Sequence, residues 1–285
     1  MKNKLFISDL DGTLLNDEAN LSNFSKEILN KLIKKGLQFT VASARSVISM
    51  KKILEGLDIE LPVIEFNGAF ISDLRTGKHI VINEIDPEIK YDVFKIIKKY
   101  ELVPFISSFN GKKDLLYYKN IQNEGCKWYV NDRIESKDSR LTKVDELYGT
   151  LKEHTICFTL IGTKGKLKEI NTELEKNYGD KIELHLIEND YSPGWYWLTV
   201  HDAKATKDQA IKELVKITGH ELDDLIVFGD NANDIKMFNL ASKAVAVDNA
   251  KDILKKHADE IIGDNNSDSV VKYIHKCFKN RQSFI

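Results

Sequence analysis

The chain has 285 residues, 42% of them hydrophobic and 30% charged, which is typical of a globular protein and excludes collagen-like and low-complexity chains. Its 42 basic and 44 acidic residues give a formal net charge of −2, so charge offers no reason to expect a nucleic acid or a membrane surface as partner. Three widely spaced cysteines (Cys126, Cys157 and Cys277) indicate reduced thiols. Because no apolar run approaches the roughly 20 residues that cross a bilayer, we expect a cytoplasmic protein.

The first eighty residues alternate strand-like and helix-like segments. Ser22 predicts a helix N-cap, and the apolar helical face that follows it ends at Gly36. Strands are expected at residues 5–7, 37–42 and 62–66, with a second helix at residues 46–56. Repeated strand–helix–strand units at this spacing predict a parallel sheet with crossover helices.

The pattern changes after Phe70. Arg75-Thr76-Gly77 and Asn110-Gly111 predict hairpin turns, and Pro87 opens an expected helix. Strands near residues 155–161 and 182–187 flank an expected helix at residues 166–178. This arrangement predicts an α+β insert.

The alternating pattern returns at Trp195. Strands are expected at residues 195–200, 225–228 and 244–247, with helices at residues 206–217 and 232–240 between them. We therefore predict a doubly wound α/β core, Rossmann-like in its parallel sheet, formed by residues 1–83 and 190–285. Residues 84–189 are expected to form an inserted α/β domain.

The most informative motif is Asp9-Leu10-Asp11-Gly12-Thr13, directly after the first strand. In a parallel sheet, ligands bind beyond the carboxyl ends of the strands. Two carboxylates there repel each other unless a cation or a proton holds them. An EF-hand calcium loop is excluded because its sixth and twelfth positions hold Leu14 and Asn20. A solvated acidic turn remains the simple alternative.

A second acidic cluster, Asp230 to Asp234, follows another expected strand. Its carboxylates are the hard oxygen ligands that Mg²⁺ prefers. Helix capping and compensation of the helix dipole are the alternative explanation. Ser43 ends the second strand and offers a hydroxyl donor, while Lys207 begins a late helix and offers a point charge for phosphate.

These segments resemble the four motifs of the haloacid dehalogenase superfamily, in their order along the chain. They are Asp9 to Thr13, Val41 to Arg45, Lys207, and Gly229-Asp230 with Asn233-Asp234. Phe66-Asn67-Gly68-Ala69 and Asp248-Asn249-Ala250 are similar to the Cof-type branch, whose phosphatases carry a large inserted cap.

The resemblance implies a role for each matched residue. Asp9 would be the nucleophile and Asp11 the general acid and base, with Ser43 and Lys207 completing the catalytic set. The residues implied to bind the substrate phosphate are Leu10, Ser43, Ala44, Lys207 and Asn233. Those implied to hold Mg²⁺ are Asp9, Asp11 through its backbone carbonyl, Asp230 and Asp234.

The sequence departs from the family at Ala44, where glycine is usual, at Asp208, where glycine usually follows the lysine, and at Ser269. Asp208 places a negative charge near the expected phosphate site unless it points to solvent or pairs with Lys204 or Lys212.

The resemblance implies a Mg²⁺-dependent phosphatase of small phosphorylated metabolites, such as sugar phosphates, that works through an aspartyl-phosphate. A sugar phosphomutase and a non-catalytic phosphometabolite-binding regulator remain alternatives.

Overall fold

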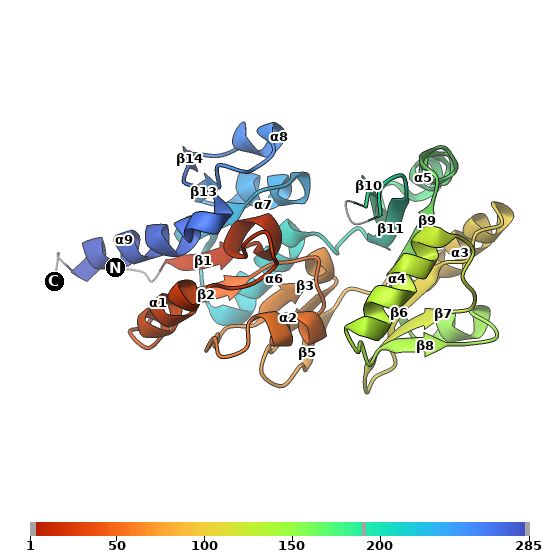
Figure 1. Ribbon diagram of the computed structural model, residues 1–285, viewed down its shortest axis with the longest axis horizontal. Coiled ribbons are helices and arrows are strands. Elements are labelled where there is room, and N and C mark those ends of the chain that lie inside the picture. Colours follow the sequence, from red (N-terminus) through yellow and green to blue (C-terminus); the bar gives the residue numbers. More distant parts are fainter. Residues whose placement is uncertain (1–3, 190–191, 283–285) are drawn as a thin grey trace. The chain divides into compact units, whose positions relative to one another are not determined.

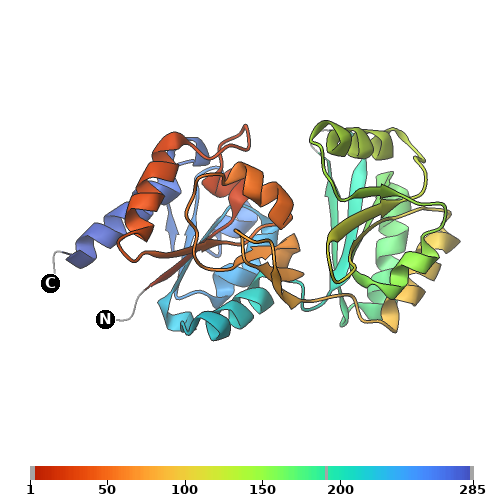
Figure 2. The same ribbon diagram turned by 90° about the horizontal axis from the view of Figure 1, so that it is seen from below.

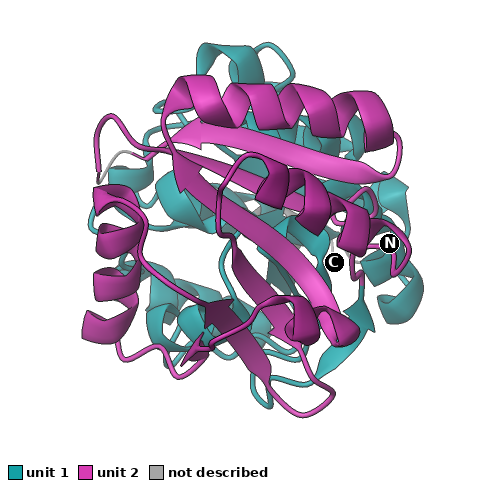
Figure 3. Ribbon diagram, turned by 90° about the vertical axis from the view of Figure 1, so that its right-hand side faces the viewer, with its two compact units in different colours: residues 1–82, 206–285 teal, residues 83–205 magenta. Residues whose placement is uncertain are grey.

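The computed structural model describes residues 4–189 and 192–282. Two units make up the chain, one formed by residues 1–82 and 206–285 and the other by residues 83–205 (Figures 1 and 3). Each unit has its own hydrophobic core, the first around Phe6 and Phe228 and the second around Phe158 and Leu198. Among the residues described, helices of the length and apolarity needed to cross a membrane are absent.

The first unit is built on a parallel sheet with the strand order β14-β13-β12-β1-β2. Its strands are β1 (Leu5–Ser8), β2 (Gln38–Val41), β12 (Leu225–Gly229), β13 (Lys243–Ala246) and β14 (Glu260–Ile261). All residues of β1 and β12 are buried, as expected for central parallel strands covered on both faces. Ser8 pairs with Phe228, so these two strands end at the same edge of the sheet. The parallel core confirms the predicted fold class.

Helices cover both faces of this sheet. They are α1 (Asn23–Ile33), α2 (Val47–Ile53), α6 (Lys207–Thr218), α7 (Ile235–Leu240), α8 (Asp252–Lys255) and α9 (Ser269–Gln282). Helices α1 and α9 contact each other on one face, and α6 contacts α7 on the other (Figure 2). The predicted cap of α1 is confirmed, because the Ser22 side chain accepts a hydrogen bond from the Ser25 backbone N–H at 2.9 Å.

A small antiparallel sheet continues the chain beyond β2. Its strands are β3 (Val63–Glu65), β4 (Phe70–Ser72) and β5 (His79–Ile82). One parallel bridge between Ala42 and Ile64 joins this sheet to the edge of the large one. The predicted turn between β4 and β5 is present: the Asp73 side chain accepts a hydrogen bond from the Thr76 backbone N–H at 2.6 Å, and Gly77 has a φ of +79°.

The second unit contains a six-stranded sheet with the order β10-β11-β9-β6-β7-β8. Its strands are β6 (Phe105–Phe109), β7 (Asp114–Tyr118), β8 (Leu141–Lys143), β9 (His154–Gly162), β10 (Ile182–Glu188) and β11 (Tyr196–Asp202). Helices α3 (Ile89–Lys99) and α5 (Lys164–Tyr178) contact each other and share one hydrophobic core, while α4 (Glu124–Glu135) packs against β9 in a separate core. The predicted hairpin at Asn110-Gly111 joins the antiparallel strands β6 and β7.

The strand predicted at residues 195–200 lies in a different sheet from the one expected. We expected it in the parallel core, but β11 pairs antiparallel with β10 and β9 in the second unit. The boundary between the units accordingly falls after Ala205, whereas we predicted that the second core segment begins at residue 190. An apolar strand before a helix has the same local pattern in both settings, so only its pairing distinguishes them.

Candidate active site

Two acidic segments meet at the carboxyl edge of the parallel sheet. Asp9 follows β1 and Asp230 follows β12, and the Asp9 backbone N–H donates to the Phe228 carbonyl at 3.0 Å. Carboxylate oxygens of Asp9, Asp230 and Asp234 lie within 4.8 Å of one another. Parallel pairing of β1 with β12 therefore gathers carboxylates that are more than 220 residues apart in sequence.

Lys207, the first residue of α6, is the cation of this cluster. Its side chain is completely buried, and Nζ lies 2.8 Å from Asp9 Oδ1 and 2.6 Å from Asp234 Oδ1. Asp234 also accepts hydrogen bonds from the backbone N–H groups of Asp230 and Asn231, each at 3.1 Å. The loop after β12 and the start of α6 are thus held together by one buried carboxylate.

Burial governs the electrostatics of the cluster. It raises the pKa of Asp9 well above its usual range, an effect that the charge of Lys207 opposes. Burial, followed by repulsion from Asp234, raises the pKa of Asp230 to about 6. Burial alone would lower the pKa of Lys207, but the charges of Asp234 and Asp9 raise it above its usual value.

The donor set of the cluster fits a hard divalent cation. It offers oxygen atoms from the carboxyl groups of Asp9, Asp230 and Asp234, and one buried lysine pairs with two of these groups, Asp9 and Asp234. With more carboxyl groups than lysines in the cluster, a bound cation would stabilise the site by offsetting the remaining negative charge. The side chain of Asp11 lies outside the group formed by the other three predicted metal residues.

Asp11 instead faces Arg45, in the segment that follows β2. Arg45 donates to both carboxylate oxygens, from Nε at 2.6 Å and from Nη2 at 2.5 Å. Such a two-pronged pair fixes the direction in which a carboxylate points. The Asp11 side chain is 48% exposed, so it contacts solvent while Asp9 is buried. The two neighbouring aspartates therefore have different environments.

The segment after β2 forms a tight turn around Ser43, which is buried. Its backbone N–H donates to the Ile64 carbonyl at 3.0 Å, and its hydroxyl accepts from the Arg45 N–H at 3.2 Å. Ala44 beside it is exposed, whereas the side chain of Leu10 is buried in the core. Of these two predicted phosphate-binding residues, Leu10 can therefore contribute only through its backbone.

Asn233, from the second acidic segment, contacts Asn67, a residue for which we predicted no role at the site. Its side-chain amide donates to Asn67 Oδ1 at 3.2 Å. Gly68 follows at a φ of +120°, and a Cβ atom there would lie 2.5 Å from the Thr206 carbonyl oxygen, just before Lys207. The Asn67-Gly68 turn therefore packs against two predicted site segments. The Phe66-Asn67-Gly68-Ala69 resemblance was the available signal.

Asp208 does not add charge to the acidic cluster. It accepts a hydrogen bond from the Thr206 hydroxyl at 2.7 Å, and Lys212 Nζ lies 3.4 Å from it. Of the expected arrangements, the structure thus shows the pairing of Asp208 with Lys212, which lies one turn further along α6.

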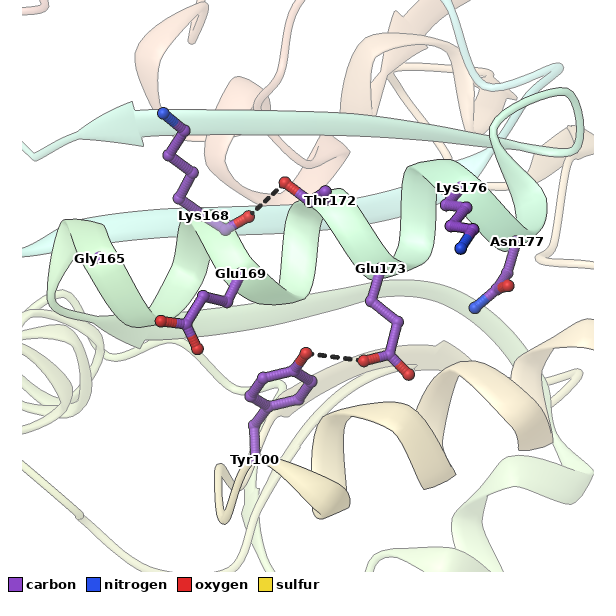
Figure 4. Close-up of a pocket in the computed structure, with 8 residues that line it drawn as sticks. All are labelled: Tyr100, Gly165, Lys168, Glu169, Thr172, Glu173, Lys176 and Asn177. Atoms are coloured by element: carbon purple, nitrogen blue, oxygen red, sulfur yellow. Dashed lines mark hydrogen bonds between the residues drawn. The ribbon is translucent and has the colours of Figure 1, made fainter.

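A pocket of about 760 Å³ lies in the second unit (Figure 4). Helix α5 contributes most of its lining, and the Tyr100 hydroxyl donates to Glu173 at 2.6 Å across it. The residues that line it do not include any predicted site residue. The acidic cluster of the first unit is therefore the candidate active site.

Known proteins resemble this chain over nearly its full length. A family model for haloacid dehalogenase-like hydrolases matches residues 6–274. The 5-amino-6-(5-phospho-D-ribitylamino)uracil phosphatase of Bacillus subtilis is 25% identical over 290 residues, covering 95% of this chain and 96% of the relative. The pyridoxal phosphate phosphatase of Escherichia coli is 24% identical over 286 residues, covering 96% and 98%. A crystal structure of a haloacid dehalogenase-like hydrolase from Bacteroides thetaiotaomicron matches with a TM-score of 0.78 at 21% identity, covering 97% of this chain and all of that one.

Proposed function

Because the chain belongs to the family of haloacid dehalogenase-like hydrolases, we propose that its acidic cluster makes it a Mg²⁺-dependent phosphatase of small phosphorylated metabolites. The observation that supports this proposal most is the buried Asp9, paired with Lys207 beside Asp230 and Asp234. Such a group can present one carboxylate to a phosphate while cationic groups offset the charge of both.

Family membership confirms three predictions made from the sequence. The resemblance to the haloacid dehalogenase superfamily and its Cof-type branch is confirmed. The fold is confirmed by the structural match and by the parallel sheet. The enzyme class, a phosphomonoester hydrolase, agrees with relatives that are named phosphatases.

The proposed reaction has two steps, both at Asp9. In the first, an Asp9 carboxylate oxygen attacks phosphorus, the bond from phosphorus to the leaving oxygen breaks, and Asp11 donates its proton to that oxygen. In the second, Asp11 takes a proton from water, whose oxygen attacks the aspartyl-phosphate, and inorganic phosphate leaves with Asp9 restored. The exposed position of Asp11 supports this division of labour, because a group that exchanges protons with water must reach it.

One set of residues would bind the cation and another the phosphoryl group. Asp9, Asp230 and Asp234 would hold Mg²⁺, with the Asp11 backbone carbonyl as the fourth proposed ligand. When bound, the ion would supply positive charge against the phosphate oxygens. Ser43 and the backbone of Ala44 would donate hydrogen bonds to phosphate, Lys207 would add a fixed positive charge, and Asn233 would orient the phosphate.

The relatives support small phosphorylated metabolites as the substrate class. One acts on pyridoxal phosphate and the other on a phosphorylated ribitylaminouracil, by their names. The free cysteines support the expected cytoplasmic location.

A panel of phosphorylated metabolites, assayed with Mg²⁺ for released phosphate, tests the proposal. We expect release without any bisphosphate activator, which a phosphomutase would require. Asp9→Asn, which keeps the shape of the side chain but removes the nucleophile, serves as the matched inactive control. EDTA should abolish turnover. Full turnover in EDTA would contradict the proposed Mg²⁺ dependence. Binding of metabolites without any release of phosphate would favour a non-catalytic regulator.

A further inference from the structure

A second buried carboxylate lies outside the proposed catalytic set. Glu65 ends β3 and is completely buried. Its Oε2 accepts a hydrogen bond from the Val47 backbone N–H at 2.5 Å, and its Oε1 accepts one from the Ser72 hydroxyl. Burying a carboxylate is costly unless such donors satisfy it, so this arrangement requires each of them.

His79 completes the support of Glu65. Its Nδ1 lies 2.7 Å from Ser72 Oγ and 3.2 Å from Glu65 Oε1. Ser72 donates its one hydroxyl hydrogen to Glu65, so in its contact with His79 it must accept. Nδ1 therefore carries the hydrogen. The ring is held in place by Phe70, which stacks on it at 3.9 Å between centroids and 4° between planes.

The bond from Val47 connects Glu65 to the proposed phosphate-binding turn. Val47 is the first residue of α2 and directly follows residues 43–46. The next two residues after Glu65 bind the same turn, because the Phe66 N–H donates to the Arg45 carbonyl at 3.2 Å and the Asn67 N–H to the Ser43 carbonyl at 2.9 Å. Residues 65–67 are thus joined by hydrogen bonds to residues 47, 45 and 43, respectively.

The need to cap the N-terminus of α2 does not by itself explain why a buried glutamate binds the Val47 N–H. The helix has its own N-cap, since the Ser46 side chain accepts from the Ser49 N–H at 3.3 Å. In addition, Phe66 and Asn67 have φ values of +49° and +56°, which residues other than glycine rarely adopt unless their surroundings impose them. In this backbone conformation the N–H groups of Phe66 and Asn67 donate to the turn.

We propose that Glu65 is a positioning residue, which fixes the turn of residues 43–46 so that Ser43 can bind the phosphoryl group. Ser72 and His79 hold the Glu65 carboxylate in that position. This inference rests on the proposed phosphatase function, and it adds to it a residue that acts through Ser43 without touching the substrate.

The test compares Glu65→Gln with the wild type, using inorganic phosphate as the probe. Glutamine keeps the size of the side chain, but its amide has one acceptor oxygen where the carboxylate has two, so Val47 and Ser72 cannot each have an acceptor of their own. We expect the inhibition constant of phosphate and the KM for p-nitrophenyl phosphate each to rise about tenfold, the effect of one lost hydrogen bond to a charged group. The Mg²⁺ concentration for half-maximal activity should not change, because Glu65 does not contact the acidic cluster in the bonds that the structure records.

Two further variants separate positioning from general stability. Ser72→Ala leaves the Val47 bond in place and should give a smaller rise in the phosphate inhibition constant. Glu60→Gln, an exposed acid just before the same strand, is the control and should behave as the wild type. In a Ser43→Ala background, Glu65→Gln should change the inhibition constant less than about twofold, because residues that act as one unit are not additive.

Hydrogen exchange gives a readout that does not depend on turnover. The Val47 amide, bound to Glu65, should exchange faster in Glu65→Gln, and the Ser25 amide in α1 should not change. An unchanged phosphate inhibition constant, or full additivity with Ser43→Ala, would overturn the positioning role while leaving the phosphatase function intact. A wild type that releases no phosphate from any phosphomonoester would instead overturn the proposed function and this role with it.

Discussion

Lys207 is the only cation recorded in ion pairs with the acidic cluster among the described residues, and it pairs with two of its members. Without Lys207, Asp9 and Asp234 would remain buried with no cation. A buried charge that loses its partner typically costs about 3–5 kcal/mol, far more than an exposed one. The stability of the metal-free protein should therefore depend strongly on this residue.

Lys207→Met tests that dependence. We expect the free energy of unfolding of the metal-free protein at pH 7 to fall by about 3–5 kcal/mol, measured by urea unfolding. Lys212→Met, on the same helix but 41% exposed, is the control and should cost about 0–1 kcal/mol. Equal losses in the two variants would show that Lys207 is not paired as the structure has it.

The residues of the acidic cluster could be predicted because each follows a strand or begins a helix in a recognisable motif. Asp9, Lys207 and Asp230 meet as their order along the chain suggested. The contacts of Glu65 and Asn67 could not be predicted in this way. Their partners, Val47 and Asn233, lie on other segments of the chain, and no local sequence pattern indicates such contacts. The pairing of Asp11 with Arg45 likewise depends on how two loops meet.

At the scale of the element, β11 contains a histidine in an unusual setting. His201 is buried, and its Nδ1 has no hydrogen-bond partner within the described residues. Burial, followed by the nearby charge of His185, lowers the pKa of His201 to about 3 from 6.5. The unfolded chain therefore binds a proton between these values while the folded protein does not.

This difference makes the second unit sensitive to acid. The contribution of a neutral His201 is fully present above pH 6.5 and is lost as the pH falls towards 3. Between pH 6.5 and 4.5 the loss is about 2 kcal/mol, and His201→Gln should remove this part of the pH dependence. Urea unfolding at a series of pH values measures it. Parallel pH profiles for the wild type and the variant would rule out the effect.

The helices and hairpins were largely predictable from local signals, such as the Ser22 cap and the Asn110-Gly111 turn. Local signals did not predict the sheet to which a strand belongs. Tyr196–Asp202 is an apolar segment followed by a helix, as a core strand would be, yet its hydrogen bonds go to β9 and β10. Pairing partners distant in sequence decided this placement.

At the scale of the whole molecule, the two units have separate cores, and the proposed metal site lies in the first. All three tryptophans, Trp128, Trp195 and Trp197, lie in the second unit. Tryptophan fluorescence therefore reports the unfolding of the second unit, while circular dichroism reports both. This distribution allows the effect of a ligand to be assigned to one unit.

Mg²⁺ at about 100 times its dissociation constant should stabilise the first unit by about 2.7 kcal/mol. We expect the circular dichroism transition in urea to move to higher concentration, and the fluorescence transition to stay in place. Asp230→Asn should abolish the shift. An equal shift of both signals would show that the units unfold together, and a shift of the fluorescence alone would place the metal in the second unit.

Rapid mixing with p-nitrophenyl phosphate distinguishes the proposed role of Asp9 as nucleophile from that of Asp11 as acid and base. Proton transfer is typically worth about 10²–10⁴ in rate, but this leaving group needs little of it. Asp11→Asn should therefore release a burst of about one nitrophenolate per active site and then turn over slowly, because the aspartyl-phosphate has lost its base. Asp9→Asn should give no burst. Loss of activity in Asp11→Asn without a burst would rule out the proposed role of Asp11, and a burst in Asp9→Asn would rule out Asp9 as the nucleophile.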